Sequence, residues 1–141
     1  VLEDREDFTK PELFPGARRT RLVDMEHLEE VCRDVTSDDY ICVMTRGHQH
    51  DFLVEKQILR TPASYIGVIG SRKKKEAVFA KLRQEGYTDQ DLARIKTPMG
   101  LDIQAETPAE IAVSIAAEMI MERARRNHIE RPNEGGKEPC V

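Results

Sequence analysis

The sequence predicts an α/β fold built on a parallel sheet, and three observations support this prediction. Two continuous apolar runs of strand length, at residues 40–44 and 65–69, suit strands that are buried on both faces. A segment with helical periodicity follows each run. Alternating strands and helices are typical of βαβ units, whose parallel sheets bind ligands beyond the carboxyl ends of their strands.

The elements expected at the start of the chain are short. Residues 1–2 resemble the end of a strand, and a connection rich in turn residues follows over residues 8–17. Residues 20–23 form a second candidate strand. Asp24 is placed to cap a helix over residues 25–32, whose apolar side chains would share one face.

The helices in the middle of the chain have recognisable boundaries. We expect the first of them over residues 49–59. Ser71 is placed to cap the next helix, and Gly86 is placed to end it. Thr88 and Asp91 have the spacing of a capping box and predict a further short helix.

The last helix has the strongest start signal. A capping box with a proline at the first helical position spans residues 107–110, after a loop or short strand over residues 98–103. We assign residues 1–126 to a single domain that this helix completes. The polar residues 127–141 are expected to form a mobile C-terminal tail.

Composition excludes several classes of function. The 22 basic and 26 acidic residues give a net charge of −4, and Trp is absent, so we expect no binding to nucleic acid. No apolar run is long enough to span a membrane. The three cysteines are odd in number and lack the CxxC spacing, which argues against a disulfide framework or a zinc site. We therefore expect a reducing compartment, the cytoplasm.

The first candidate site follows the strand at residues 65–69. Gly70 allows close approach of a ligand, and Ser71 begins a helix whose first peptide N–H groups are free to bind an anion. Arg72 and Lys73 add positive charge at the same point. The alternative is an exposed basic turn without a ligand.

The second candidate site follows the strand at residues 40–44. It contains Thr45, Gly47, His48 and Asp51, and the last two are spaced to meet on the first turn of a helix. These groups would form the polar wall of a ligand pocket. We interpret His50 as an ordinary surface histidine, and we expect no metal site because alternate residues of a helix point apart.

Two further groups of residues are candidates on weaker grounds. Gly100 and Asp102 precede the last helix, where Asp102 either contacts a ligand or forms a turn. Glu3, Asp4 and Arg5 follow the first strand, at the position where dinucleotide-binding folds hold ribose hydroxyls. The glycine-rich fingerprint of those folds is absent from this sequence.

Four segments, taken in order, resemble the Rossmann domain of the XdhC/CoxI family. They are VLEDREDF, YICVMTRGHQHD, YIGVIGSRK and PMGLDIQAETPAEIAVSIAAEMI. The last two are the most specific, and the resemblance covers about residues 1–126. It implies a Rossmann-like, doubly wound parallel sheet.

The resemblance also implies a function and its partners. The chain would be a chaperone-like accessory factor of molybdenum hydroxylases such as xanthine dehydrogenase, rather than an enzyme with a settled reaction. It would bind the molybdenum cofactor, a molybdopterin that is in some cases a dinucleotide, protect it during sulfuration and pass it on. The implied partners are the hydroxylase apoenzyme and a cysteine desulfurase or other sulfurtransferase.

These implications give each candidate residue a role. Gly70, Ser71 and Arg72 would hold the cofactor phosphate. Thr45, His48 and Asp102 would supply donors and acceptors for the pterin edge. Glu3 or Asp4 would hold a ribose in a dinucleotide form of the cofactor.

The sequence departs from the family pattern at its start. The family's domain opens with a strand and a glycine-rich turn that this chain lacks, and in the usual order that strand lies in the middle of the sheet. We therefore expect that the strands near Val1 and Thr20 are not joined to those at Tyr40 and Tyr65. We also expect that the chain does not fold alone as a monomer, and that a homo-oligomer or a separate upstream segment supplies the strand.

Two other functions remain open. An NAD(P)-binding oxidoreductase follows from analogy of fold, although no hydride-transfer machinery is visible in the sequence. The chain is alternatively an interaction module without a small-molecule ligand. In that case the alanine-rich face of the helix over residues 107–126 would serve as a dimer interface, whereas burial on its own sheet is the simpler interpretation.

Overall fold

The computed structural model describes the backbone of residues 1–46 and 48–130, and the side chains of residues 1–46 and 50–128. The chain forms two compact units, Val1–Pro98 and Met99–Val141, each of which is described by itself. The first unit contains, in order, β1 (Leu2–Glu3), η1 (Glu6–Phe8), η2 (Pro11–Leu13), β2 (Arg21–Leu22), α1 (Glu29–Arg33), β3 (Tyr40–Val43), α2 (His48–Ile58), β4 (Tyr65–Val68), α3 (Arg72–Gln84), α4 (Asp89–Leu92) and β5 (Ile95–Lys96).

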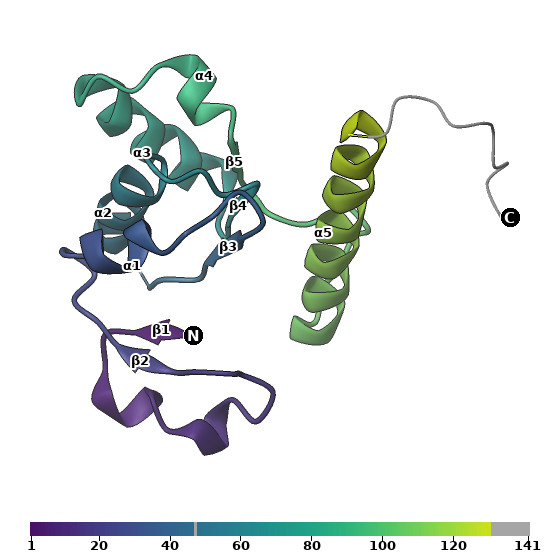
Figure 1. Cartoon of the computed structure of the whole chain (residues 1–141). Helices are drawn as coiled ribbons and strands as arrows, with labels where there is room; N and C mark the ends of the chain where they lie inside the picture. The colour runs from purple at the N-terminus through teal and green to yellow at the C-terminus, as the bar shows by residue number, and fades with distance from the viewer. Residues whose placement is uncertain (47, 131–141) are drawn as a thin grey trace, which may run out of the picture. The chain divides into compact units, whose positions relative to one another are not determined.

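The strands of the first unit form two separate parallel sheets. One pairs β1 with β2, and the other has the order β3-β4-β5 (Figure 1). This confirms the predicted α/β fold and the predicted separation of the first two strands from the others. Among the described residues, no strand of one sheet pairs with a strand of the other.

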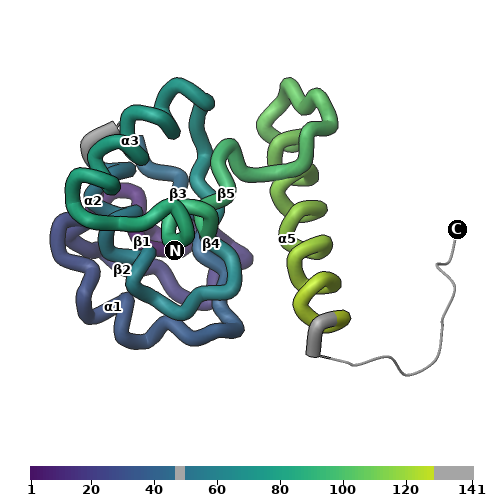
Figure 2. The backbone as a smooth tube through the Cα atoms, turned by 90° about the horizontal axis from the view of Figure 1, so that it is seen from above, coloured from purple at the N-terminus to yellow at the C-terminus, as the bar shows by residue number. Residues whose placement is uncertain are grey.

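The hydrophobic core of this unit lies between the larger sheet and its helices. In both views α2 and α3 lie side by side next to this sheet (Figure 1, Figure 2). The buried core residues extend along the chain from Leu28 to Ile95. All four residues of β4 are buried, as predicted for a strand covered on both faces.

The prediction that β3 is also buried on both faces is wrong. Only Val43 of this strand is buried, and Cys42 is exposed. The physical reason is position, because β3 pairs with β4 on one side and with no described strand on the other. Tyr40 is half-buried and stacks on Tyr65 of β4, with 5.6 Å between ring centroids.

The predicted helix boundaries are confirmed for α3 and α4. The Ser71 side chain accepts a hydrogen bond from the Lys74 amide and caps α3, and Gly86 follows that helix with a φ of +91°. The capping box of Thr88 and Asp91 is present at α4.

Two elements differ from the prediction. The helix expected from residue 25 is the short α1, which begins at Glu29. The Asp24 carboxylate accepts a hydrogen bond from the Glu26 amide at 2.9 Å, so it closes a turn before the helix instead of capping it. The strand β5 was not predicted at Ile95–Lys96, because two residues give no periodic signal.

The second compact unit contains α5 (Pro108–Glu130), which starts where the capping box predicts. The helix extends past residue 126, so residues 127–130, assigned to the tail, are helical. The rest of the assigned tail, residues 131–141, lies outside the described residues. The sequence predicts one domain over residues 1–126, whereas the structure divides the chain into two units after Pro98. Within the second unit, Gly100 and Leu101 form hydrogen bonds with side chains of α5. Among the described residues, no helix has the length and apolarity needed to cross a bilayer.

Candidate functional site

The pairing of β3 with β4 brings two of the predicted polar turns to the same edge of the sheet. Val43 lies opposite Val68 in the parallel register, and the Ile69 amide donates to the Val43 carbonyl at 3.0 Å. The turns that begin at Thr45 and at Gly70 therefore leave the sheet next to each other. Gly47 lies outside the described residues, as does the side chain of His48.

The start of α3 has the features of an anion site. Arg72 and Lys73 are exposed in its first turn, where a helix has peptide N–H groups without intrahelical partners. A side chain added at Gly70 would meet only the aliphatic part of Lys74, at 3.7 Å, so the approach to this turn is open. The positive side chains and the helix dipole act in the same direction here, in favour of a bound anion.

Asp51, predicted to face a ligand together with His48, is a buried residue with a structural partner. Its carboxylate accepts a hydrogen bond from the Thr45 hydroxyl, and only 3% of the residue is exposed. This bond ties the first turn of α2 to the end of β3. Thr45 and Asp51 therefore shape the loop, and the groups left to contact a ligand are others.

Glu55 is a buried acid that sequence reasoning missed. It lies one helical turn after Asp51, it is 2% exposed, and its Oε2 atom has no hydrogen-bond partner. Burial, with a smaller contribution from the charge of Asp51, raises the pKa of Glu55 to about 8. Its spacing from Asp51 and Ile58 on the buried face of α2 was a signal that could have identified it.

Glu3, Asp4 and Arg5, at the end of β1 and just after it, make different contacts. The Arg5 guanidinium donates to the Glu3 carboxylate at 2.7 Å and lies 3.7 Å above the Phe8 ring. This hydrogen bond holds the pKa of Glu3 below its usual value. Arg5 also lies 3.8 Å from the Asp4 carboxylate, so one guanidinium contacts both acids, and Asp4 is the one of the two that lines a pocket.

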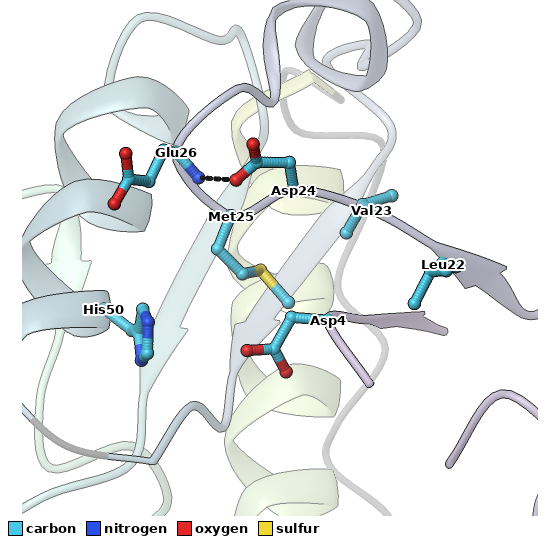
Figure 3. A pocket seen from close by; sticks show the side chains of 7 residues that line it. All are labelled: Asp4, Leu22, Val23, Asp24, Met25, Glu26 and His50. Atoms are coloured by element: carbon cyan, nitrogen blue, oxygen red, sulfur yellow. Dashed lines mark hydrogen bonds between the residues drawn. The ribbon is translucent and has the colours of Figure 1, made fainter. Parts of the chain in front are cut away.

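Asp4 lines a pocket of about 510 Å³ in the first unit (Figure 3). The pocket lies at the carboxyl ends of β1 and β2 and reaches α2, the helix that follows β3. Its lining residues are Asp4, Leu22, Val23, Asp24, Met25, Glu26 and His50. Its lining therefore combines the chain after β1 and β2 with the first turns of α2.

The pocket and the start of α3 have opposite charge. Asp4, Asp24 and Glu26 give the pocket an acidic lining, whereas Arg72 and Lys73 are basic. An anionic group is therefore favoured at α3 and disfavoured in the pocket. The arrangement suits a ligand that is anionic at one end and rich in hydrogen-bond donors at the other.

Gly100 and Asp102 belong to the second compact unit, where they have local structural roles. Gly100 has a φ of +100°, and a Cβ atom there would lie 2.4 Å from the Ser114 Oγ atom of α5. The Gly100 amide donates to the Glu118 carboxylate at 2.8 Å. The exposed Asp102 carboxylate accepts from the Gln104 amide at 3.4 Å, which favours the turn-forming interpretation of this residue.

The parallel strands and the helices between them define a Rossmann-like α/β domain, with a candidate ligand site at the carboxyl edge of its sheet. Residues 1–119 match the family model described as the XdhC Rossmann domain. The chain therefore belongs to this family, as the four sequence segments predict.

Curated proteins and a solved structure are similar to the chain. It is 31% identical to the uncharacterized protein YqeB of Escherichia coli K12, over 78% of the chain and 20% of that protein. It is 32% identical to a probable xanthine dehydrogenase subunit of Bacillus subtilis 168, over 62% of the chain and 24% of that protein. A crystal structure of a xanthine dehydrogenase from Bacillus halodurans superposes with a TM-score of 0.74 and 27% identity, over 94% of the chain and 37% of that structure. The chain thus spans about a fifth to a quarter of the curated relatives.

Proposed function

We propose that the chain is the cofactor-binding part of an accessory factor for molybdenum hydroxylases of the xanthine dehydrogenase type. In this proposal it holds the molybdenum cofactor while the cofactor is sulfurated and then inserted into the apoenzyme. Similarity to one protein named as a xanthine dehydrogenase, and to another named as a probable subunit of such an enzyme, supports the link. The apoenzyme and a sulfurtransferase are the proposed partners.

The observation that carries the proposal is the pair of oppositely charged subsites near the carboxyl ends of the strands. Molybdopterin carries a phosphate, which needs an anion site such as the start of α3 with Arg72 and Lys73. Its pterin ring presents hydrogen-bond donors, which need acceptors such as those in the pocket with Asp4. A site for an anion alone would not require the acidic pocket.

The cysteines favour a binding role over a sulfur-carrying one. Cys32 and Cys42 are the two cysteines among the described residues. Desolvation of the sulfur atoms raises the pKa of both thiols, including that of Cys42 on the exposed strand β3, which makes them poorer nucleophiles than a free cysteine.

The proposal is tested by the variant Arg72→Ala in the full-length protein, with binding of the molybdenum cofactor measured by calorimetry. Loss of one charge-assisted contact to a phosphate should weaken binding by about 10- to 100-fold, from ~1.5–3 kcal/mol. Lys81→Ala is the matched control, because Lys81 lies in the last turn of the same helix. Equal affinity in Arg72→Ala and wild type would contradict the phosphate site.

The same titrations distinguish the two alternative functions. NAD⁺ and NADP⁺ are titrated in parallel, and binding of either without binding of the molybdenum cofactor would favour an oxidoreductase. Binding of none of these ligands by the wild-type protein would favour an interaction module. Either result would reject the proposed function.

A further inference from the structure

One face of the helix α5 is occupied within the second compact unit. Among the described residues of α5, Ser114, Ile115 and Glu118 are buried. The Ser114 hydroxyl donates to the Leu101 carbonyl, and the Glu118 carboxylate accepts from the Gly100 amide at 2.8 Å. The loop that precedes the helix therefore lies on this face.

The opposite face of α5 exposes an apolar stripe. With a rotation of about 100° per residue, the stripe lies on the side of the helix away from Ser114 and Glu118. Its two large side chains are 62% exposed at Val113 and 57% exposed at Ile120, and they lie about two helical turns apart. Its other members, Ala109 and Ala116, are exposed as well. An apolar stripe of this kind favours contact with another apolar surface.

The spacing of the stripe is typical of a helix that pairs with another helix. The steps from Ala109 to Val113, Ala116 and Ile120 are four, three and four residues, which is the heptad spacing of side chains that meet a partner helix. In an antiparallel pair, Val113 of one helix lies against Ala116 of the other. Ile120 likewise lies against Ala109. Each layer then combines a large side chain with a small one, so a second copy of the same helix fits the stripe.

The charges at the two ends of the stripe select the antiparallel orientation. Three residues before Ala109 the same line reaches Glu106, and three residues after Ile120 it reaches Arg123. Both charged side chains are exposed. Antiparallel pairing sets Glu106 of each copy against Arg123 of the other and opposes the two helix dipoles. Parallel pairing would set like charges against each other at both ends.

We propose that α5 forms an antiparallel interface with α5 of a second copy of the chain. The interface is independent of the ligand that the first unit binds, so its failure would leave the proposed function standing. A contact between two helices of this length is at the small end of interface sizes, so association should depend on protein concentration.

The first test measures the dimer dissociation constant of the full-length protein by sedimentation. Ile120→Glu should raise this constant by about tenfold or more, because it buries an unpaired charge in the interface. Ile103→Glu is the matched control, since Ile103 is an exposed isoleucine of the same unit outside α5, and its effect should be less than about twofold. A protein that is monomeric at all concentrations, or a dimer that Ile120→Glu leaves unchanged, would overturn the proposal.

The second test exchanges the charges at the ends of the stripe. Arg123→Glu should weaken the dimer by about threefold or more, because it places acid against acid in both symmetric contacts. The double variant Glu106→Arg with Arg123→Glu restores opposite charges and should recover most of the loss. A double variant no tighter than Arg123→Glu alone would contradict the antiparallel pairing.

The third test identifies the contact directly. Full-length Ala109→Cys, isotopically labelled, is mixed with unlabelled Ile120→Cys, oxidised and analysed by mass spectrometry. Within one helix these positions are about 16 Å apart, too far for a disulfide, so a labelled–unlabelled bond between positions 109 and 120 reports two copies. Bonds that join position 120 to position 120 instead would indicate a parallel pair and overturn the proposal. A lower melting temperature of Ile120→Glu without any change in mass would also overturn it, because another part of the same chain would then cover the stripe.

Discussion

The two sheets of the first compact unit are stabilised to very different extents. The sheet β3-β4-β5 is covered by a core whose buried residues extend from Leu28 to Ile95, with β4 buried throughout. The sheet β1-β2 has two residues in each strand, and no residue before Val23 contributes to that core. On the smaller sheet Leu2 and Leu22 are exposed.

The pocket is lined by residues from both the weakly packed part and the well-packed part of the unit. Asp4 and the residues from Leu22 to Glu26 come from or directly follow the weakly packed strands, whereas His50 comes from a helix anchored in the core. A ligand in the pocket would contact both parts and would stabilise the smaller sheet against the larger one. Ligand binding and the order of β1-β2 should therefore be coupled.

The largest effect is expected from the free edges of β1 and β3. Each edge presents backbone groups that no described strand pairs, which favours association with another strand. We expect residues 1–141, produced alone, to associate or to remain partly unfolded, as measured by light scattering after size-exclusion chromatography. Hydrogen exchange should be slow at Ile66 and Val68 and fast at Glu3 and Leu22. A monodisperse monomer with all of these amides protected would contradict the prediction.

The next effect compares one leucine from each part. Leu82 of α3 is 0% exposed, and Leu13 near the smaller sheet is 52% exposed. Leu82→Ala should lower the free energy of unfolding by about 3–5 kcal/mol through lost burial and a cavity, and Leu13→Ala by less than about 1 kcal/mol. Urea unfolding of the full-length protein measures both. Similar costs would show that the two parts are equally well packed.

A smaller effect on the free energy of unfolding is expected from Glu55, the buried acid on the core-facing side of α2. The pKa of Glu55 is about 8 in the folded protein, against an ordinary value of 4.5. Between these values the folded state holds a proton that the unfolded state has lost, so stability decreases as pH rises through this range. We expect a loss on the order of 3 kcal/mol between pH 5 and pH 8.5.

Glu55→Gln is the variant that tests this dependence, since it keeps the shape and cannot ionise. Its unfolding free energy should change little between pH 5 and pH 8.5, and at pH 8.5 it should exceed that of the wild type. Glu85→Gln, which alters an exposed acid, is the control and should keep the wild-type slope. A wild-type protein whose stability is flat or rises over this range would show that Glu55 is ionised when folded.

Sequence patterns predicted the well-packed part more accurately than the rest, for physical reasons. Caps such as Ser71 and Thr88 depend on residues three or four positions away, so local sequence determines them. The apolar run of β4 marks a buried strand by itself. β5 depends on pairing with β4 for its definition, and its two residues carry no pattern of their own.

The candidate site was predictable only as separate pieces. The basic turn at Arg72 could be identified from the strand, glycine and cap that surround it. The pocket position of His50 could not, because it depends on how α2 lies relative to the chain after β1 and β2. For the same reason the sequence leaves open whether Glu3 or Asp4 contacts a ligand, because the position of Arg5 beside Glu3 depends on the fold.

The smallest predicted effect compares two threonine hydroxyls. Thr88 caps α4 within a capping box, whereas the Thr9 hydroxyl donates to the Glu6 carbonyl in an exposed turn after η1. Thr88→Ala should lower the unfolding free energy by about 1 kcal/mol because a helix N–H loses its acceptor, and Thr9→Ala by less than about 0.5 kcal/mol. Thermal unfolding of both variants at one pH provides the measurement. If Thr9→Ala were the more destabilising change, the turn before β2 would contribute more to stability than its exposure implies, and the contrast between the two sheets would have to be reduced.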